Sequence, residues 1–305
     1  MRAQSILQLA AAAIFATAGF MTAFPVAAQA EKPAQLTIAV IPDETDAEMI
    51  ARYEGFAKYL TDKTGIPVRL QQVTDSAAVV EGLRNNQVDL VRLGPAGYVT
   101  AYNVTEGRVE PVVAELDSSG NFGYNSVLFV RKDSPFKSVS DLKGRSVAFG
   151  EATSTSSYQA PVYFLRQQGI EAEKFFGKTG FVGGQPAVQV SAVHNGTYDA
   201  AFGGYRSETS NTVVDVEKTG VVPAGELRII WTSPKLPSSL WAVRADHSVE
   251  LKKQLADAII NLKTENPQLW AVFSGGKVSG FQRVTHADYE GIAEILAANE
   301  ADRRN

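Results

Sequence analysis

The sequence predicts an α/β fold built as two lobes that the chain joins by two crossovers. Three observations lead to this prediction. Buried strand patterns alternate with helical patterns, the alternation starts again after residue 121, and 305 residues exceed what one small core needs. Such alternation is typical of parallel sheets with right-handed crossovers. We expect one lobe to comprise residues 31–121 plus 238–305, and the other to comprise residues 122–237.

The first 30 residues have the pattern of a cleavable signal peptide. Arg2 supplies the positive start, an apolar stretch runs from Ile6 to Phe24, and Ala28-Gln29-Ala30 fits the small-residue cleavage pattern. The apolar stretch is short for a membrane anchor, and no other segment is long and apolar enough to span a bilayer. We therefore expect export, with cleavage after Ala30.

Strands and helices alternate at the start of the first lobe. Residues 45–48 form a capping box, and apolar residues then recur at helical spacing until Gly65, which predicts a helix. A second helix is expected to begin at Asp75 or Ser76. Apolar runs predict buried strands at residues 36–41, 68–70 and 88–91. This order predicts parallel pairing of the three strands.

The second lobe repeats the pattern after the turn-rich residues 117–121. A strand at 146–150 runs directly into a segment rich in hydroxyl side chains, and the helix beyond it ends at Gly169. The remaining elements, some of which return to the first lobe, are predicted from the same periodicities. They are strands at 126–130, 199–202, 227–231 and 240–243, and helices at 141–144, 186–195, 249–263, 267–273 and 287–298.

Composition and motifs exclude several classes of function. The net charge of −4 is spread without blocks, which argues against a nucleic-acid partner. The chain has no cysteine, so it has no disulfide, thiol nucleophile or thiolate metal site. His194, His247 and His286 lack metal-ligand spacing, and we expect surface or capping roles for them. Asp43 and Glu44 could hold a cation, but a helix entry favours acidic residues anyway. We expect no enzyme, no cofactor and no metal.

The hydroxyl-rich residues 153–157 are the strongest candidate for a binding feature. They lie between a strand end and a helix start, where unpaired N–H groups and the positive end of the helix dipole point outward. Such a helix start binds a tetrahedral oxyanion without a cation. Serine and threonine are also favoured there as simple N-caps, and the residues alone leave both interpretations open.

Short motifs that run through the chain carry a family resemblance. They are Ile38-Ala39-Val40-Ile41-Pro42, Leu93-Gly94-Pro95-Ala96-Gly97-Tyr98, Tyr124-Asn125-Ser126-Val127, Arg131-Lys132-Asp133-Ser134-Pro135, Asp141-Leu142-Lys143-Gly144, Ser154-Thr155-Ser156 and Trp231-Thr232-Ser233-Pro234. Together they resemble the phosphonate, phosphite and hypophosphite family of periplasmic solute-binding proteins, which serve ABC importers. The resemblance spans nearly the whole mature chain. It implies a type II periplasmic binding protein with two α/β lobes joined by two hinge crossovers.

The resemblance also implies which residues contact the ligand. The family holds phosphonate oxygens with its Ser-Thr-Ser triplet, which implies this role for Ser154, Thr155 and Ser156. It places a ligand-contacting tyrosine at the position of Tyr124. Gln185 is the nearest equivalent of a histidine that aminoalkylphosphonate binders present after a glycine.

Other positions depart from the aminoalkylphosphonate pattern. Where those binders present carboxylates to an ammonium group, this chain has Tyr205 or Arg206, and Ser239. An ammonium would lack a counter-ion, so we do not expect such a ligand. Arg92 and Arg206 are further candidates, because guanidinium forks suit oxyanions, although either could form an ordinary salt bridge.

We therefore expect a monomeric periplasmic receptor without catalytic activity. It captures a small phosphorus oxyanion (phosphite, phosphonate or phosphate-like) in a cleft between the lobes and delivers it to an ABC permease of the inner membrane. The ligand could also be another oxyanion or a carboxylate-bearing solute. As an alternative function, the protein could present an oxyanion such as arsenite or phosphate to a sensor histidine kinase. Hinges are expected near residues 121–124 and 231–240.

Overall fold

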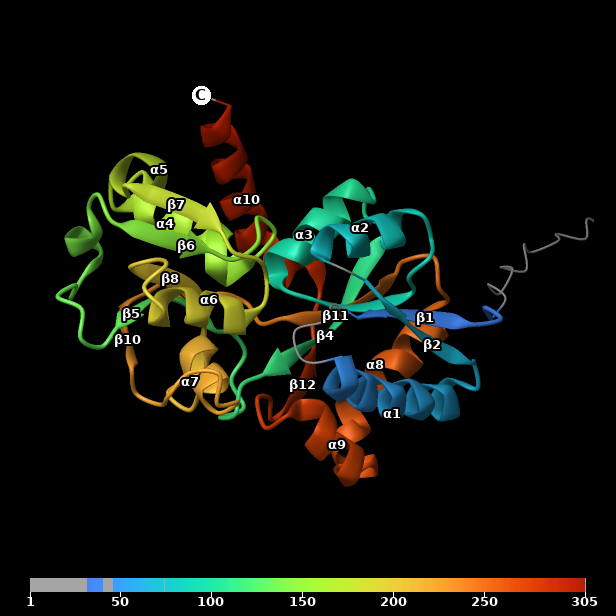
Figure 1. Cartoon of the computed structure of the whole chain (residues 1–305). Helices are drawn as coiled ribbons and strands as arrows, with labels where there is room; N and C mark the ends of the chain where they lie inside the picture. Colours follow the sequence, from blue (N-terminus) through green and yellow to red (C-terminus); the bar gives the residue numbers. More distant parts are fainter. Residues whose placement is uncertain (1–31, 41–45, 74, 305) are drawn as a thin grey trace, which may run out of the picture. The chain divides into compact units, whose positions relative to one another are not determined.

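The computed structural model describes residues 32–40, 46–73 and 75–304 (Figure 1). The expected signal peptide, Asp43, Glu44 and the start of the first capping box lie outside these residues. In the described part of the chain, none of the helices has the length and apolar character needed to cross a membrane. Its strands form two sheets, each of which has its own helices and its own core.

The first sheet has the strand order β12-β4-β11-β3-β1-β2. Its strands are β1 (Leu36–Val40), β2 (Val68–Gln72), β3 (Leu90–Leu93), β4 (Val109–Leu116), β11 (Leu240–Arg244) and β12 (Gly280–Arg283). The predicted parallel pairing is confirmed for β1 with β2 and β3. The complete sheet is mixed, because β11 is antiparallel to β3 and β4, and β12 is antiparallel to β4.

Helices pack against both faces of this sheet. They are α1 (Asp46–Thr64), α2 (Ser76–Arg84), α3 (Pro95–Val104), α8 (Val249–Glu265), α9 (Pro267–Ser274) and α10 (Glu290–Arg303). On one face, α1, α8 and α9 bury an aromatic cluster around Trp241, with Phe56 and Phe273 stacked at 4.3 Å between ring centroids. On the other face lie α2, α3 and α10. Asp75 is the N-cap of α2, since its carboxylate accepts a hydrogen bond from the Ala78 N–H at 2.9 Å.

The second sheet has the order β10-β5-β8-β6-β7, with β9 paired to β8. Its strands are β5 (Asn125–Arg131), β6 (Ser146–Phe149), β7 (Lys178–Phe181), β8 (Ala200–Ser207), β9 (Ser210–Asn211) and β10 (Leu227–Thr232). Its helices are α4 (Ala160–Gln167), α5 (Ala172–Phe175), α6 (Pro186–His194) and α7 (Thr212–Glu217). The helices α4 and α5 pack on one face, and α6 and α7 pack on the other.

The two segments by which the chain passes between the sheets are hydrogen-bonded to each other. Tyr124 and Leu236 exchange backbone hydrogen bonds at 2.9 and 2.7 Å, and the Gly123 N–H donates to Oγ of Ser238 at 2.7 Å. Gly123 has φ +101°, and a Cβ at this position would lie 2.7 Å from the Leu236 carbonyl oxygen, so only glycine fits. The segments expected to be hinges therefore form one short ribbon.

The C-terminal helix α10 contacts elements of both sheets' lobes. Figure 1 shows α10 next to α4, and it packs against α3 as well. The Arg166 guanidinium of α4 donates to the Ala298 carbonyl and to Oδ1 of Asn299, both at 3.1 Å. Nδ2 of Asn299 donates to the backbone oxygen and to Oε1 of Gln159, at 2.9 and 2.8 Å. Helix α10 is thus a third connection between the lobes.

Candidate functional site

The hydroxyl-rich segment forms a tight turn before α4. Thr155–Gln159 is a π-helical turn, η2, and Ser154 is its N-cap. Oγ of Ser154 accepts hydrogen bonds from the Ser157 N–H at 3.3 Å and from the Ser157 hydroxyl at 2.6 Å. The Gln159 amide donates to the Ala152 carbonyl at 2.5 Å, which ties the turn to the loop before it. Ser154 therefore has the capping role that the sequence left open.

Thr155 joins this turn to the first lobe. Its hydroxyl oxygen accepts a hydrogen bond from the Ala96 N–H at 2.8 Å, and the residue is only 3% exposed. Ala96 lies in the first turn of α3, where N–H groups have no partner within the helix. A Cβ on Gly94 would lie 3.7 Å from the same hydroxyl oxygen. The starts of η2 and α3, which belong to different lobes, thus face each other.

Tyr124 and Ser156 lie above Gly204 of β8. The Ser126 hydroxyl, on the strand paired with Gly204, donates to the Ser156 carbonyl at 2.6 Å. A Cβ on Gly204 would lie 3.4 Å from Oγ of Ser156 and 3.6 Å from the Tyr124 ring, so the glycine leaves room for both. Burial raises the pKa of the Tyr124 phenol, although hydrogen bonding with the hydroxyls of Thr155 and Ser156 opposes this rise.

Arg92 and Arg206 come from different sheets and share one buried carboxylate, that of Glu115 on β4. Nε of Arg92 lies 2.5 Å from Oε1 of Glu115, and Nη2 of Arg206 lies 3.6 Å from Oε2. Burial alone would raise the pKa of Glu115, but the two guanidiniums outweigh it and hold that pKa below its usual value. The same two guanidiniums also act on the pKa of Tyr124. Both arginines form salt bridges, and both lie close to Tyr124. We call Tyr124, Thr155, Ser156, Arg92 and Arg206 the cluster.

Sequence reasoning missed Glu115, which joins the two arginines. The signal available was a pair of acidic side chains, Glu110 and Glu115, in the otherwise apolar run Val109–Leu116, and the periodicities did not predict a strand there. Glu115 is only 6% exposed, and a carboxylate is rarely so buried unless it is paired. One partner, Arg92, comes from β3, and the other, Arg206, comes from β8, about 90 residues after Glu115. No local spacing in the sequence identifies such distant partners.

Tyr205 lies on the other face of its sheet from Tyr124, Ser156 and Arg206. Side chains alternate along a strand, and Gly204 faces η2, so Tyr205 faces the other side of the sheet. Gly203 lies on that other side as well, because a Cβ there would lie 2.5 Å from Oγ1 of Thr212 in α7.

Gln185 is exposed at the N-cap of α6 and also lies apart from the cluster. One turn later, Gln189 is buried, and its amide donates to the Gly183 carbonyl at 3.2 Å. A Cβ on Gly150 would lie 2.6 Å from Nε2 of Gln189. Gln189 is therefore the amide side chain that reaches the start of the hydroxyl-rich segment.

The three histidines have separate partners. Nε2 of His194 lies 2.7 Å from the Glu226 carboxylate, and the ring of His286 is stacked on that of Tyr102 at 3.8 Å between centroids. His247 is buried, and its Nε2 is 2.9 Å from Oδ1 of Asp89. The expectation of a surface or capping role is therefore wrong for His247, because a buried carboxylate holds its ring inside the first lobe.

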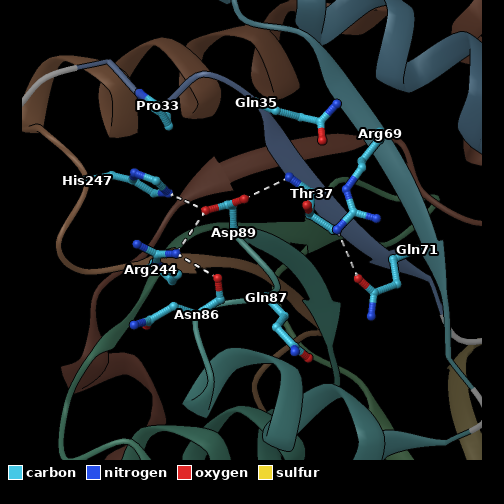
Figure 2. Close-up of a pocket in the computed structure, with 10 residues that line it drawn as sticks. All are labelled: Pro33, Gln35, Thr37, Arg69, Gln71, Asn86, Gln87, Asp89, Arg244 and His247. Atoms are coloured by element: carbon cyan, nitrogen blue, oxygen red, sulfur yellow. Dashed lines mark hydrogen bonds and ion pairs between the residues drawn. The ribbon is translucent and has the colours of Figure 1, made fainter.

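A polar cavity of about 420 Å³ lies at the amino end of β3, whereas Arg92 lies near its carboxyl end (Figure 2). Asp89 accepts a hydrogen bond there from the Thr37 N–H at 2.8 Å and pairs with His247 and Arg244. These bonds join the amino ends of β1 and β3 to the end of β11, which is a structural role. The lining residues are Pro33, Gln35, Thr37, Arg69, Gln71, Asn86, Gln87, Asp89, Arg244 and His247, and they include none of the predicted site residues.

Comparison with known families identifies the chain. A family described as "ABC transporter, phosphonate, periplasmic substrate-binding protein" matches residues 38–289. The chain belongs to this family. The match contains all the predicted site residues and both segments that connect the lobes. The resemblance inferred from short motifs is confirmed.

Relatives of this phosphonate-binding family agree in sequence and fold. The chain is 28% identical to the phosphate-import protein PhnD of Mycolicibacterium smegmatis, over 89% of this chain and 88% of the relative. It is 26% identical to the probable ABC transporter phosphite-binding protein PhnD1 of Prochlorococcus marinus, over 86% and 89%. The crystal structure of that PhnD1 with methylphosphonate superposes with a TM-score of 0.73 at 24% identity, covering 88% of this chain and 99% of that chain. The predicted type II periplasmic binding protein fold is confirmed.

Proposed function

We propose that this chain captures a small phosphorus oxyanion, such as phosphite, a phosphonate or phosphate, in a cleft between its lobes. It then delivers the anion to an ABC permease of the inner membrane. The single observation that carries this proposal is the meeting of hydroxyl and guanidinium groups from both lobes at the starts of η2 and α3. Relatives named for phosphate and phosphite support the ligand class.

The proposed contacts follow from the donors in the cluster. The hydroxyls of Thr155, Ser156 and Tyr124 supply neutral hydrogen bonds, and Arg92 and Arg206 supply charge-assisted ones. Ser154 acts indirectly, because it caps the turn that carries the other two hydroxyls. An oxyanion oxygen can replace the Thr155 hydroxyl at the Ala96 N–H, since helix starts bind anions. We leave Tyr205 and Gln185 outside the site because of their positions.

The proposed mechanism is capture and release, with no bond made or broken in the ligand. The lobes, at residues 31–121 plus 238–305 and at residues 122–237, close around the anion by bending at the ribbon of Gly123, Tyr124 and Leu236. The anion favours the closed form only through contacts that the open form lacks. Contacts from both lobes, such as Arg92 and Ser156, provide that difference.

The proposed site of action is the periplasm, where the mature protein works as a monomer after cleavage behind Ala30. Secretion from a bacterial host followed by intact-mass measurement tests the export step. The mass expected is that of a chain beginning at Glu31. A secreted protein that retains residues 1–30 would contradict the proposed cleavage.

Isothermal titration calorimetry tests the ligand class. The panel is phosphite, methylphosphonate, phosphate, sulfate, arsenite and 2-aminoethylphosphonate, titrated into the purified protein. We expect a phosphorus oxyanion to bind most tightly, and the amino compound to bind more weakly than methylphosphonate, because its ammonium would lie near Arg92 and Arg206. Tightest binding of sulfate or arsenite, or no binding of any phosphorus compound, would contradict the proposal.

A further inference from the structure

The Glu115 carboxylate has one oxygen that the fold leaves without a hydrogen bond. Oε1 is hydrogen-bonded to Arg92, whereas Oε2 is buried and has no hydrogen-bond partner among the described residues. Nη2 of Arg206 lies 3.6 Å from Oε2, which is an ion pair but too long for a hydrogen bond. A buried acceptor without a donor is costly, and such atoms in native proteins usually have a functional explanation.

Glu115 is a fixed negative charge at this site. Arg92 on β3, Arg206 on β8 and Lys277, in the loop before β12, all favour its ionised form, and together they outweigh the effect of burial. Burial, and to a smaller extent the Glu115 charge, raises the pKa of the Tyr289 phenol. The Tyr124 phenol lies near both arginines. An anion bound by Arg92 and Arg206 therefore approaches a carboxylate that is itself negative.

A proton on the ligand oxygen turns its contact with the carboxylate into a hydrogen bond, which offsets the repulsion between the two negative groups. A ligand oxygen that carries a hydrogen can donate to Oε2, so that the buried acceptor and the ligand satisfy each other. A ligand oxygen without a hydrogen would place two acceptors against each other in a buried site, which costs binding free energy. Two guanidiniums and one carboxylate also leave a local charge that matches a monoanion.

We propose that Oε2 of Glu115 accepts a hydrogen bond from an O–H group of the bound anion, so that the site takes protonated phosphorus oxyanions and rejects sulfate and sulfonates. This inference rests on the proposed function. Phosphite and alkylphosphonates carry an O–H only as monoanions, whereas phosphate keeps one as the dianion. Sulfate and sulfonates are fully ionised at neutral pH and have none. Glu115 therefore determines specificity by the protonation of the ligand.

Methylphosphonate and methanesulfonate are the decisive pair, because they are similar in shape and differ in whether they can carry a proton at neutral pH. Calorimetry on the wild-type protein should show methylphosphonate binding tighter by about 10- to 100-fold, the amount that one charge-assisted hydrogen bond provides. The affinity for methylphosphonate should fall as the pH rises past the second ionisation of methylphosphonate, because the dianion has no O–H group. The affinity for phosphate should change less over the same range.

The variant Glu115→Gln tests the residue itself. The amide can donate to an unprotonated oxygen, so the variant should lose most of the preference for methylphosphonate and gain affinity for methanesulfonate. Glu110→Gln is the matched control, since Glu110 lies on the same strand and pairs with Lys252 at 2.8 Å, away from the cluster. This control should keep the wild-type preference.

The outcomes separate this inference from the function on which it rests. If the wild-type protein binds both anions equally, or if Glu115→Gln keeps the wild-type preference, the role of Glu115 is overturned and the proposed function stands. If no phosphorus oxyanion binds the wild-type protein, the proposed function and this inference fail together. The wild-type comparison needs no variant, so misfolding of Glu115→Gln would leave the test intact.

Discussion

Thr155 of the second lobe accepts a hydrogen bond from the Ala96 N–H of the first lobe at 2.8 Å. This bond places a hydroxyl oxygen at the first turn of α3, where an anion would also be favoured. The residues around it, Tyr124 and Ser156, belong to the second lobe, and Arg92 reaches the same cluster from the first. The account of ligand binding depends on this junction of the two lobes.

Removing the hydroxyls of Ser154, Thr155 and Ser156 together should abolish oxyanion binding. We expect about 0.5–2 kcal/mol of destabilisation from the lost Ser154 cap, and about 1–3 kcal/mol more because the Ala96 N–H loses the Thr155 hydroxyl as its acceptor. Calorimetry and urea denaturation of the triple alanine variant measure both effects. Ser138→Ala is the control, because Ser138 caps another helical turn of the same lobe. Unchanged binding in the triple variant would place the ligand elsewhere.

Arg92 and Arg69 distinguish the cluster from the cavity of Figure 2, since they lie toward opposite ends of the first sheet. Arg92→Ala should weaken binding by at least about 10-fold, because it removes a charge-assisted donor. It should also cost about 3 kcal/mol or more of stability, because it leaves Glu115 with one partner fewer. Arg69→Ala should leave affinity near the wild-type value. The reverse pattern would assign binding to the cavity.

The pKa of Glu115 makes the stability of the fold depend on pH in a defined direction. Because the two arginines hold this pKa below the usual 4.5, the stabilisation from the ion pairs is fully present above that pH. It is lost as the pH falls through the lower pKa of the folded state. The free energy of unfolding should therefore differ most between wild type and Glu115→Gln at neutral pH, and the difference should shrink in acid. A constant difference across this range would show that the carboxylate is not ionised in the fold.

Asn299 should stabilise the hydroxyl-rich turn from a distance. Asn299→Ala removes both donors to Gln159 and leaves buried oxygens unpaired, which should cost about 1–3 kcal/mol. Amide hydrogen exchange should then increase in residues 152–159. Arg304→Ala, at the exposed C-terminal end of α10, is the control and should have no effect there. Unchanged exchange in Asn299→Ala would show that α10 does not support the turn.

Local patterns predicted much of the fold, since strand and helix periodicity are local properties. The strands β1, β5, β6 and β11 and the helices α2, α6 and α8 were predicted to within a few residues. The sequence missed α3, α5, α7, β4, β7, β9 and β12. Proline and glycine at the start of α3 obscure its periodicity, and β7 and β12 have four residues each. Predictions of their pairing would need contacts that are distant in sequence.

The candidate site was predicted in part. The hydroxyl side chains between a predicted strand and a predicted helix indicated residues 153–157 as a candidate site, because N-caps and anion sites favour the same side chains. The mutual pairing of Arg92, Glu115 and Arg206 was not predictable, since it joins three strands from two sheets. The burial of His247 was missed for the same reason, because its partner Asp89 lies 158 positions away in the chain.

A crystal structure of the protein with methylphosphonate tests the central claim most directly. The account predicts that the phosphorus atom lies between the lobes, with its oxygens in hydrogen-bonding contact with Thr155, Ser156 and Tyr124, and with Arg92 and Arg206 on either side. The Ala96 N–H should then donate to the ligand or to Thr155. Methylphosphonate found in the cavity beside Arg69, with the cluster unchanged, would contradict the account.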